Sequence, residues 1–153
     1  MSLSHSQKDI SLKLLDRYEK IIEGTDIGTW EWNIQTGETI FNEKWAQIIG
    51  YTLKELEPLS IETWTKSCHE EDLKKSGELL EKHFSGETDF YVCEARMKHK
   101  SGHWVWVLDK GKVVSRTTDG KPEWMAVSHH DITIRVNNEH LIAQYKDLLE
   151  KSN

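Results

Sequence analysis

Several patterns that would identify a protein class are missing from this chain of 153 residues. The two cysteines, Cys68 and Cys93, form no closely spaced pair. No apolar run approaches the length of a membrane span. The N-terminal residues MSLSHSQKDISLK have no basic start followed by an apolar core, which excludes a signal peptide. We therefore expect a cytoplasmic location, two reduced thiols and no membrane contact within this chain.

Positive charge is also in short supply. The formal net charge is −6, and arginine is scarce among the basic residues. No face or segment gathers the lysines and arginines that a nucleic-acid interface requires. The acidic balance disfavours nucleic acid and anionic membranes as partners, and the length fits one domain.

The hydrophobic spacing alternates between helical and strand periods. Residues 10–22 have helical spacing, and Gly24 is expected to end that helix. A hairpin follows, with Trp30 and Trp32 on one strand face. Short helices capped by Asn42, Thr52 and Ser60 come next. The remaining elements are a longer helix over residues 70–84, strands over 90–98, 103–116 and 124–132, and a last helix. This order predicts an α+β fold with one antiparallel sheet and helices on one face.

Four segments then match a known family. They are GTWEWN, W-x-x-I-I-G-Y-T-x-x-E-L, R-M-x-x-x-S-G-x-W-x-W and a closing D-I-T-x-R, and they occur in this order over about residues 25–135. The chain resembles the PAS domain, most closely the tryptophan-rich branch of bacterial and archaeal signalling proteins. It departs from that pattern at Glu70, where a proline is usual, and at Ile134 and Val136.

The resemblance implies a five-stranded antiparallel sheet wrapped by short helices, and a sensory, dimerising or signal-relay role. It divides the chain into an N-terminal flanking helix (residues 1–24), a sensor domain (25–135) and the start of a coiled-coil linker helix (136–153). We expect a non-catalytic module taken from a larger protein, and the parent protein that we expect first is a sensor histidine kinase. A diguanylate cyclase or phosphodiesterase, a transcription regulator and a ligand-free dimeriser remain alternatives.

The D-I-T-x-R segment, with Asp131, Ile132, Thr133 and Arg135, is the candidate relay site. No glycine or proline separates the last strand from the helix that follows it. Asp131 is expected to cap the free N–H groups of the first helical turn, with Thr133 as a second cap. Arg135 is expected to pair with Asp131.

The last helix carries a short apolar repeat that favours pairing with another helix. The alternative is a helix that folds back on its own sheet. The repeat is a heptad seam of Asn138, Leu141, Tyr145, Leu148 and Ser152, and the apolar Ile142 and Leu149 widen it. We expect a homodimer through the terminal helices, the sheet face or both, and a covalently linked output domain. Some of the seven tryptophans should face outward and be covered at such an interface.

A pocket is expected between the sheet and the short helices. Its predicted lining is apolar, which favours a small organic ligand, and a completely filled core is the alternative. The candidate residues are Phe41, Trp45, Ile49, Trp64, Leu80, Tyr91, Cys93 and Met97.

No cofactor is expected, and no metal site. His83 occupies the helix where some haem-binding relatives place their ligand, but a core-edge imidazole is favoured. Cys68 lacks the sequence context of flavin-binding relatives. The pair His129 and His130 lies in a predicted strand, which disfavours a phosphoacceptor and places the two rings on opposite faces. A stand-alone enzyme would need a nucleophile beside a base, and the sequence suggests no such set.

Overall fold

The computed structural model describes residues 2 and 4–152 and confirms the predicted α+β architecture. Met1, Leu3 and Asn153, at the ends of the two predicted terminal segments, lie outside the described residues. The elements are α1 (His5–Thr25), β1 (Gly28–Asn33), β2 (Thr39–Phe41), α2 (Glu43–Ile48), α3 (Leu53–Leu56), α4 (Ile61–Ser67), α5 (Glu70–Phe84), β3 (Tyr91–Lys98), β4 (Trp104–Arg116), β5 (Pro122–Asp131) and α6 (Thr133–Lys151).

The five strands form one antiparallel sheet in the order β2-β1-β5-β4-β3. Strand alternation sends one set of side chains toward the helices and the other away from them. Trp30 on the inner face is paired with Phe41 and Val127, and all three are at most 6% exposed. The outer face leaves Ile40, Val92 and Trp104 exposed. The outward tryptophan expected from the sequence is therefore present.

The short helices begin where the sequence predicts. The side chain of Asn42 accepts a hydrogen bond from Trp45 N–H at 3.0 Å and another from Thr29 N–H at 2.9 Å. This one side chain therefore caps α2 and fixes it against β1. Thr52 and Glu55 form a reciprocal capping box at the start of α3.

Helix α1 continues beyond its predicted end. Gly24 lies inside the last turn; the helix ends at Thr25 and is capped by Asp26, which has a left-handed backbone with φ of 52°. The prediction that Gly24 ends the helix is wrong, because aspartate also tolerates this conformation. The Asp26 N–H bonds to Glu23 O at 3.2 Å, and its carboxylate pairs with Lys44 at 3.1 Å.

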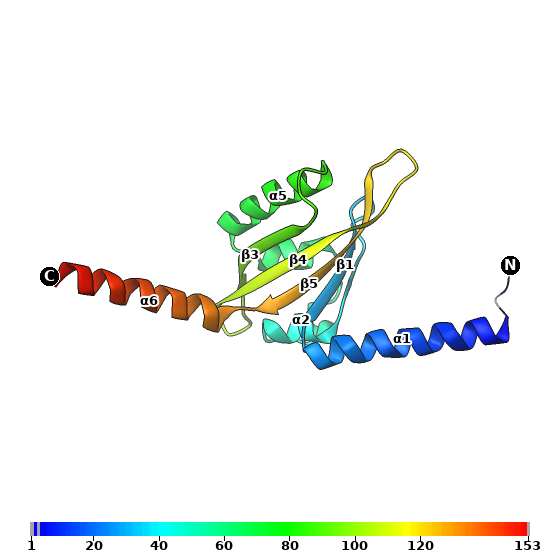
Figure 1. Ribbon diagram of the computed structural model, residues 1–153, viewed down its shortest axis with the longest axis horizontal. Coiled ribbons are helices and arrows are strands. Elements are labelled where there is room, and N and C mark those ends of the chain that lie inside the picture. Colours follow the sequence, from blue (N-terminus) through cyan, green and yellow to red (C-terminus); the bar gives the residue numbers. More distant parts are fainter. Residues whose placement is uncertain (1, 3, 153) are drawn as a thin grey trace.

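The two terminal helices leave the sheet in opposite directions (Figure 1). Within the described part of α6, Val136 alone is buried, and Leu141, Tyr145 and Leu148 are each more than 60% exposed. Helix α6 does not fold back on its sheet in this structure. Its apolar repeat and the apolar residues of α1 both face solvent.

Candidate functional site

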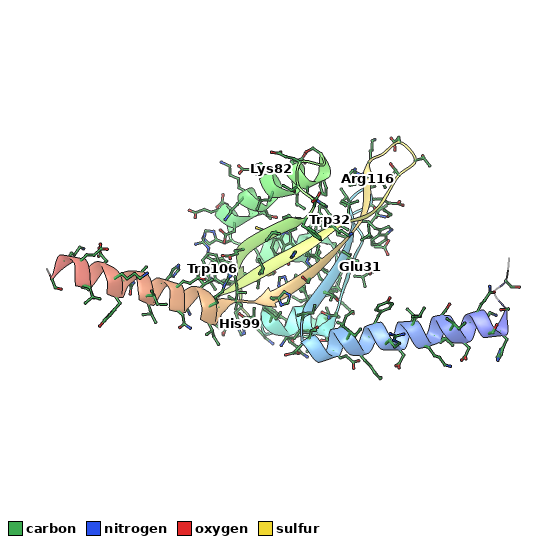
Figure 2. All side chains as sticks on the ribbon, viewed as in Figure 1. Glu31, Trp32, Lys82, His99, Trp106 and Arg116 are labelled. Atoms are coloured by element: carbon green, nitrogen blue, oxygen red, sulfur yellow. The ribbon has the colours of Figure 1, made fainter. Side chains whose placement is uncertain are left out.

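The start of α6 is bonded to β4, the strand next to β5 in the sheet. The N–H of Ile132 donates to Trp106 O at 2.8 Å, and the hydroxyl of Thr133 accepts from Trp106 N–H at 3.1 Å. Figure 2 shows Trp106 near the start of α6. The backbone of one residue on β4 therefore holds both residues at the strand-to-helix junction. Thr133 was predicted to cap the helix, and instead its hydroxyl serves the neighbouring strand.

Asp131 orders this junction as expected. Its Oδ1 accepts the Thr133 N–H at 3.0 Å, which is the first amide of α6, and the Thr133 hydroxyl at 2.7 Å. Ile132 is the N-cap residue and has no side-chain cap bond. The carboxylate of Asp131 thus satisfies one free amide and orients the hydroxyl that bonds to Trp106.

The predicted pair between Arg135 and Asp131 is wrong. The Arg135 guanidinium instead bonds to Glu94 on β3 and lies 3.8 Å from Glu139 in the next helical turn. The four-residue spacing brings side chains together only when both residues are helical. Asp131 is still part of β5, so its carboxylate points elsewhere.

The structure divides the eight predicted pocket residues into two groups. Trp64, Leu80 and Tyr91 line a cavity of about 180 Å³ between the sheet and helices α4 and α5. The other five are packed side chains of the core, at most 6% exposed: Phe41, Trp45, Ile49, Cys93 and Met97. These five residues fill the core and line no cavity, which was the alternative to a pocket.

Sequence reasoning missed much of the cavity wall. Strands β1 and β5 contribute Trp30, Trp32, Met125 and Val127. Helices α4 and α5 contribute Ile61, Thr65, Leu73, Ser76 and Gly77. The inward alternation of β1 and β5 was the available signal, because it puts Trp30, Trp32, Met125 and Val127 on the face that the helices cover.

Polar groups lie within or beside this largely apolar wall. The hydroxyls of Ser76 and Tyr91 are 2.6 Å apart, and burial raises the pKa of the tyrosine well above its usual value. The indole N–H of Trp32 is buried and has no hydrogen-bond partner among the described residues.

A buried acid–imidazole pair adjoins the cavity. Asp109 on β4 and His129 on β5 are both fully buried, and Oδ1 lies 2.6 Å from Nδ1. The indole of Trp30, which lines the cavity, donates to the same Oδ1 at 3.3 Å. Asp109 Oδ2 and His129 Nε2 have no partner among the described residues. The two residues are directly paired across the strands, which the sequence could not reveal without the register.

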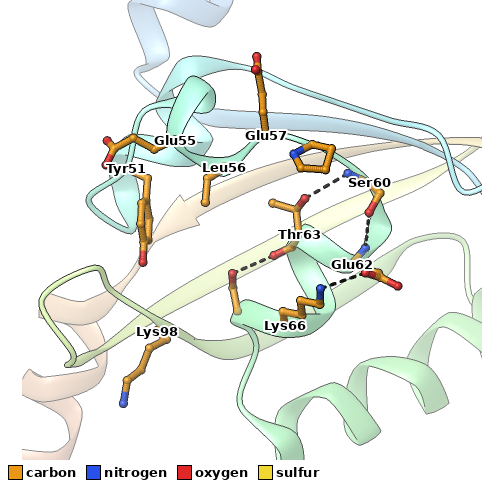
Figure 3. A pocket seen from close by; sticks show the side chains of 11 residues that line it. Tyr51, Glu55, Leu56, Glu57, Ser60, Glu62, Thr63, Lys66 and Lys98 are labelled. Atoms are coloured by element: carbon orange, nitrogen blue, oxygen red, sulfur yellow. Dashed lines mark hydrogen bonds and ion pairs between the residues drawn. The ribbon is translucent and has the colours of Figure 1, made fainter.

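A second hollow of about 580 Å³ lies at the surface beside α3 and α4 (Figure 3). The polar groups that α4 contributes bond to one another or to the α4 backbone. Ser60 Oγ accepts from Glu62 N–H at 3.1 Å, Thr63 Oγ1 accepts from Ser60 N–H at 3.1 Å, and Lys66 pairs with Glu62 at 3.1 Å. These contacts cap and brace α4.

The residues considered for haem and flavin have structural contacts. His83 is buried, its Nδ1 bonds with Thr88 O at 3.0 Å, and its Nε2 accepts from Val113 N–H at 2.9 Å. Burial, reinforced by the charge of Asp72, raises the pKa of the Cys68 thiol to about 12. His129 and His130 point to opposite faces, and only His129 is fully buried.

The described residues form neither a metal-binding cluster nor a membrane-spanning helix. Over residues 2 and 4–152, no group of three or more histidine, cysteine, aspartate or glutamate side chains is placed to hold a metal ion. No helix in the same part of the chain is both long and apolar enough to cross a membrane.

Solved structures resemble this one over most of its length. A sensory box histidine kinase/response regulator from Burkholderia thailandensis is 25% identical, with a TM-score of 0.76 over 88% of this chain and 98% of that one. The N-terminal domain of a diguanylate cyclase with PAS/PAC sensor from Marinobacter aquaeolei is 24% identical, with a TM-score of 0.60 over 71% of this chain and 97% of that one. The second likeness concerns the fold alone.

The sequence comparisons agree with the structural ones. A curated relative, the probable diguanylate cyclase DgcE of Escherichia coli, is 32% identical over 73% of this chain. The chain spans about a tenth of that relative's length, since the match covers 10% of it. The family model described as the PAS fold matches residues 38–129, which covers every element from β2 through most of β5. The chain belongs to the PAS fold family.

Proposed function

We propose that this chain is a non-catalytic sensory module that passes a change inside its sheet to an output domain through α6. The observation that carries the proposal is the junction. The first two residues after β5 are bonded to Trp106 on β4, whereas the apolar repeat of α6 is exposed. A helix held firmly at one end and free along its length acts as a lever.

A chain of contacts connects the cavity to this lever. Asp72 in the first turn of α5 accepts from Arg96 Nε at 2.8 Å and from Arg96 N–H at 2.7 Å. The Arg96 guanidinium lies over the Trp106 ring, 5.2 Å from its centroid. Movement of α5, which forms one wall of the cavity, would therefore act on the residue that holds α6. A signal would shift the population between two junction geometries.

We place a second copy of this chain against the exposed apolar residues of α1 and α6 or against the outer sheet face. Exposed apolar surface of this extent is typical of an interface. The output domain we propose first is a histidine kinase, as in the Burkholderia protein, and second a diguanylate cyclase, as in the E. coli protein.

The test uses the parent protein and measures its output activity with substitutions at the junction. Asp131→Ala and Thr133→Val each remove junction hydrogen bonds, and a bias of about 1–2 kcal/mol changes a two-state ratio by roughly 5–30-fold. We expect both variants to keep the fold, as judged by circular dichroism, and to change the output activity of the parent protein by roughly 5–30-fold. Asn137→Ala, exposed in the second turn, is the matched control and should change nothing. Normal output from both junction variants would refute the relay.

A further inference from the structure

His83, in the last turn of α5, is a buried histidine whose two ring nitrogens both bond to the backbone. Its Nε2 accepts the Val113 N–H at 2.9 Å, so this nitrogen carries no hydrogen. The single hydrogen of the neutral ring therefore belongs to Nδ1, which donates it to Thr88 O at 3.0 Å. The residue is only 6% exposed. These contacts fit one tautomer of the neutral imidazole and use its full hydrogen-bonding capacity.

The two bonds of His83 join three parts of the domain. Thr88 lies in the loop between α5 and β3, and Val113 lies in β4 where the pairing with β5 becomes irregular. Among the described residues, one other hydrogen bond ties the end of α5 to β4, in which Arg116 Nη2 donates to Phe84 O at 3.3 Å. The position of the last turn of α5 therefore depends strongly on His83.

Protonation of the ring is incompatible with this arrangement. Nδ1 already carries a hydrogen, so an added proton can enter only at Nε2. The cationic ring would then point an N–H at the N–H of Val113, and the hydrogen bond between them would be lost. The same step would leave a positive charge in a buried position, which is costly unless a counter-ion is near.

The charged groups around His83 do not supply that counter-ion. Figure 2 shows Lys82 and Arg116 at this end of the domain, and both are positive. Among the described histidines, His129 has a carboxylate within ion-pair distance, and His83 has none. The charged residues on the segments around His83 are Lys82 on α5, Glu87 and Asp89 in the loop, Lys112 and Arg116 on β4, and Glu123 on β5. All of them except the half-buried Glu123, which is 3.5 Å from the Ser115 hydroxyl, are exposed to solvent.

Helix α5 is held at both of its ends. Asp72 in the first turn accepts from Arg96, whose guanidinium lies over the Trp106 ring, and His83 holds the last turn. Release of the last turn would let α5 move about its first turn. That movement would reach Trp106, whose backbone bonds to the start of α6.

We propose that His83 makes this module responsive to protons, because protonation of its ring breaks the bond from Val113 and releases the end of α5 from β4. The ligand is the proton, and His83 is not among the residues that line the cavity. Histidine changes its charge between about pH 5 and 8, so the response falls in that range. The released form takes up one proton, so the equilibrium constant for release rises by up to about tenfold per pH unit of acidification. The effect on α6 rests on the sensory function proposed above, whereas the release itself does not.

The test follows the Val113 amide by hydrogen exchange at about pH 7.5 and about pH 5.5, on either side of the midpoint for a released histidine. Each rate is divided into the rate of an unstructured peptide at the same pH, which gives a protection factor. We expect the protection factor of Val113 to fall by about tenfold at the lower pH. The protection factor of Val107, in the middle of the same strand, should stay constant. Long-range proton–nitrogen spectra of the ring should show the Nδ1–H tautomer at the higher pH.

Two glutamine substitutions separate protonation of His83 from other effects of acid. His83→Gln removes the titrating ring and keeps a side-chain oxygen that can accept the Val113 N–H. The ratio of its Val113 protection factors at the two pH values should be close to unity. His140→Gln, at an exposed position in α6, removes another histidine and is the matched control. It should show the same fall as the parent sequence. The dispersed spectrum of each variant reports that it is folded.

Any of three results would overturn the assignment: constant protection of Val113 in the parent sequence, an equal fall in His83→Gln, or an Nε2–H tautomer at the higher pH. The experiment uses the chain alone, so its failure is separate from a failure of the relay. If Val113 keeps its protection but Thr133→Val still changes the output, the proton site falls and the relay stands. If Val113 loses protection as expected but Thr133→Val leaves the output normal, the relay falls and the proton site stands.

Discussion

The Thr133 hydroxyl accepts a hydrogen bond from the backbone N–H of Trp106 at 3.1 Å, across the boundary between β4 and α6. A hydroxyl has one hydrogen, and Asp131 Oδ1, at 2.7 Å, is its nearest acceptor. The carboxylate therefore turns the lone pairs of Thr133 toward Trp106. The direction in which α6 leaves the domain is thus linked to β4, the neighbour of β5 in the sheet.

Thr133→Val keeps the shape of this side chain and removes the hydrogen bonds of its hydroxyl with Trp106 and Asp131. We expect the free energy of unfolding to fall by about 1–2 kcal/mol, because the Trp106 N–H loses its acceptor in a half-buried position. Amide hydrogen exchange at Trp106 should accelerate more than exchange at Val105. Ile134→Ala, at a position that is 79% exposed, is the comparison and should change neither quantity. Unchanged exchange at Trp106 in the valine variant would show that the hydroxyl does not hold the strand.

The buried pair of Asp109 and His129 should be costly to break. Asp109→Ala leaves His129 Nδ1 and the Trp30 indole N–H without an acceptor, which predicts a loss of about 2–5 kcal/mol in urea unfolding. Asp109→Asn keeps an oxygen at the same place and should cost less. His130→Ala, the neighbouring histidine on the outer face, should cost less than about 1 kcal/mol. Equal losses for Asp109→Ala and His130→Ala would contradict this account.

The pair of Asp72 and Arg96 predicts how stability depends on pH. Burial by itself would raise the pKa of Asp72, but the hydrogen bonds and charge of Arg96 outweigh it and hold that pKa below its usual value. A depressed pKa contributes stability above the unfolded value of about 3.9, and the contribution is lost as the pH falls through the folded value.

Asp72→Asn tests this directly. The variant should be less stable than the parent sequence by a constant amount above about pH 5, and the difference should shrink below about pH 4. Glu71→Gln is the matched neighbour, because the Glu71 side chain is 79% exposed and its pair with Arg96 spans 3.3 Å. That variant should show little effect at any pH. A difference between Asp72→Asn and the parent sequence that is the same at all pH values would contradict the assigned role.

The two thiols should be inert while the domain is folded. Burial raises the pKa of Cys68 to about 12 and that of Cys93 to about 11, so almost no thiolate is present at neutral pH. We expect an aromatic disulfide reagent to modify neither cysteine in buffer and both in denaturant. Modification of the folded chain within minutes would show that the core opens at these positions.

The parts of the fold that follow local rules could be predicted from the sequence. Strand alternation puts Trp30 on the core face, and Asn42 and Thr52 cap helices because their short side chains reach free amides. The junction at Asp131 was found for the same reason. The end of α1 was missed because Gly24 is the usual signal, yet Asp26 adopts the left-handed backbone.

The parts that depend on register and on three-dimensional packing could not be predicted. Asp109 meets His129 only because β4 and β5 pair at that residue. Arg135 selects Glu94 because β3 lies beside the helix start, which is not a property of spacing along the chain. The eight residues predicted to line the pocket are mostly apolar and lie in the interior, as expected. Which of them line the cavity and which fill the core depends on how α4 and α5 pack against the sheet.

We infer that the junction fixes the direction of α6 relative to the sheet. Nitroxide labels on Glu87→Cys, in the exposed loop before β3, and on Lys146→Cys, exposed in α6, measure that direction by pulsed electron paramagnetic resonance. Cys68 and Cys93 are buried and stay unlabelled, and excess unlabelled chain suppresses distances between copies. We predict a narrow distance distribution in the parent sequence and a broad one in Thr133→Val. Equally narrow distributions in both chains would contradict the claim.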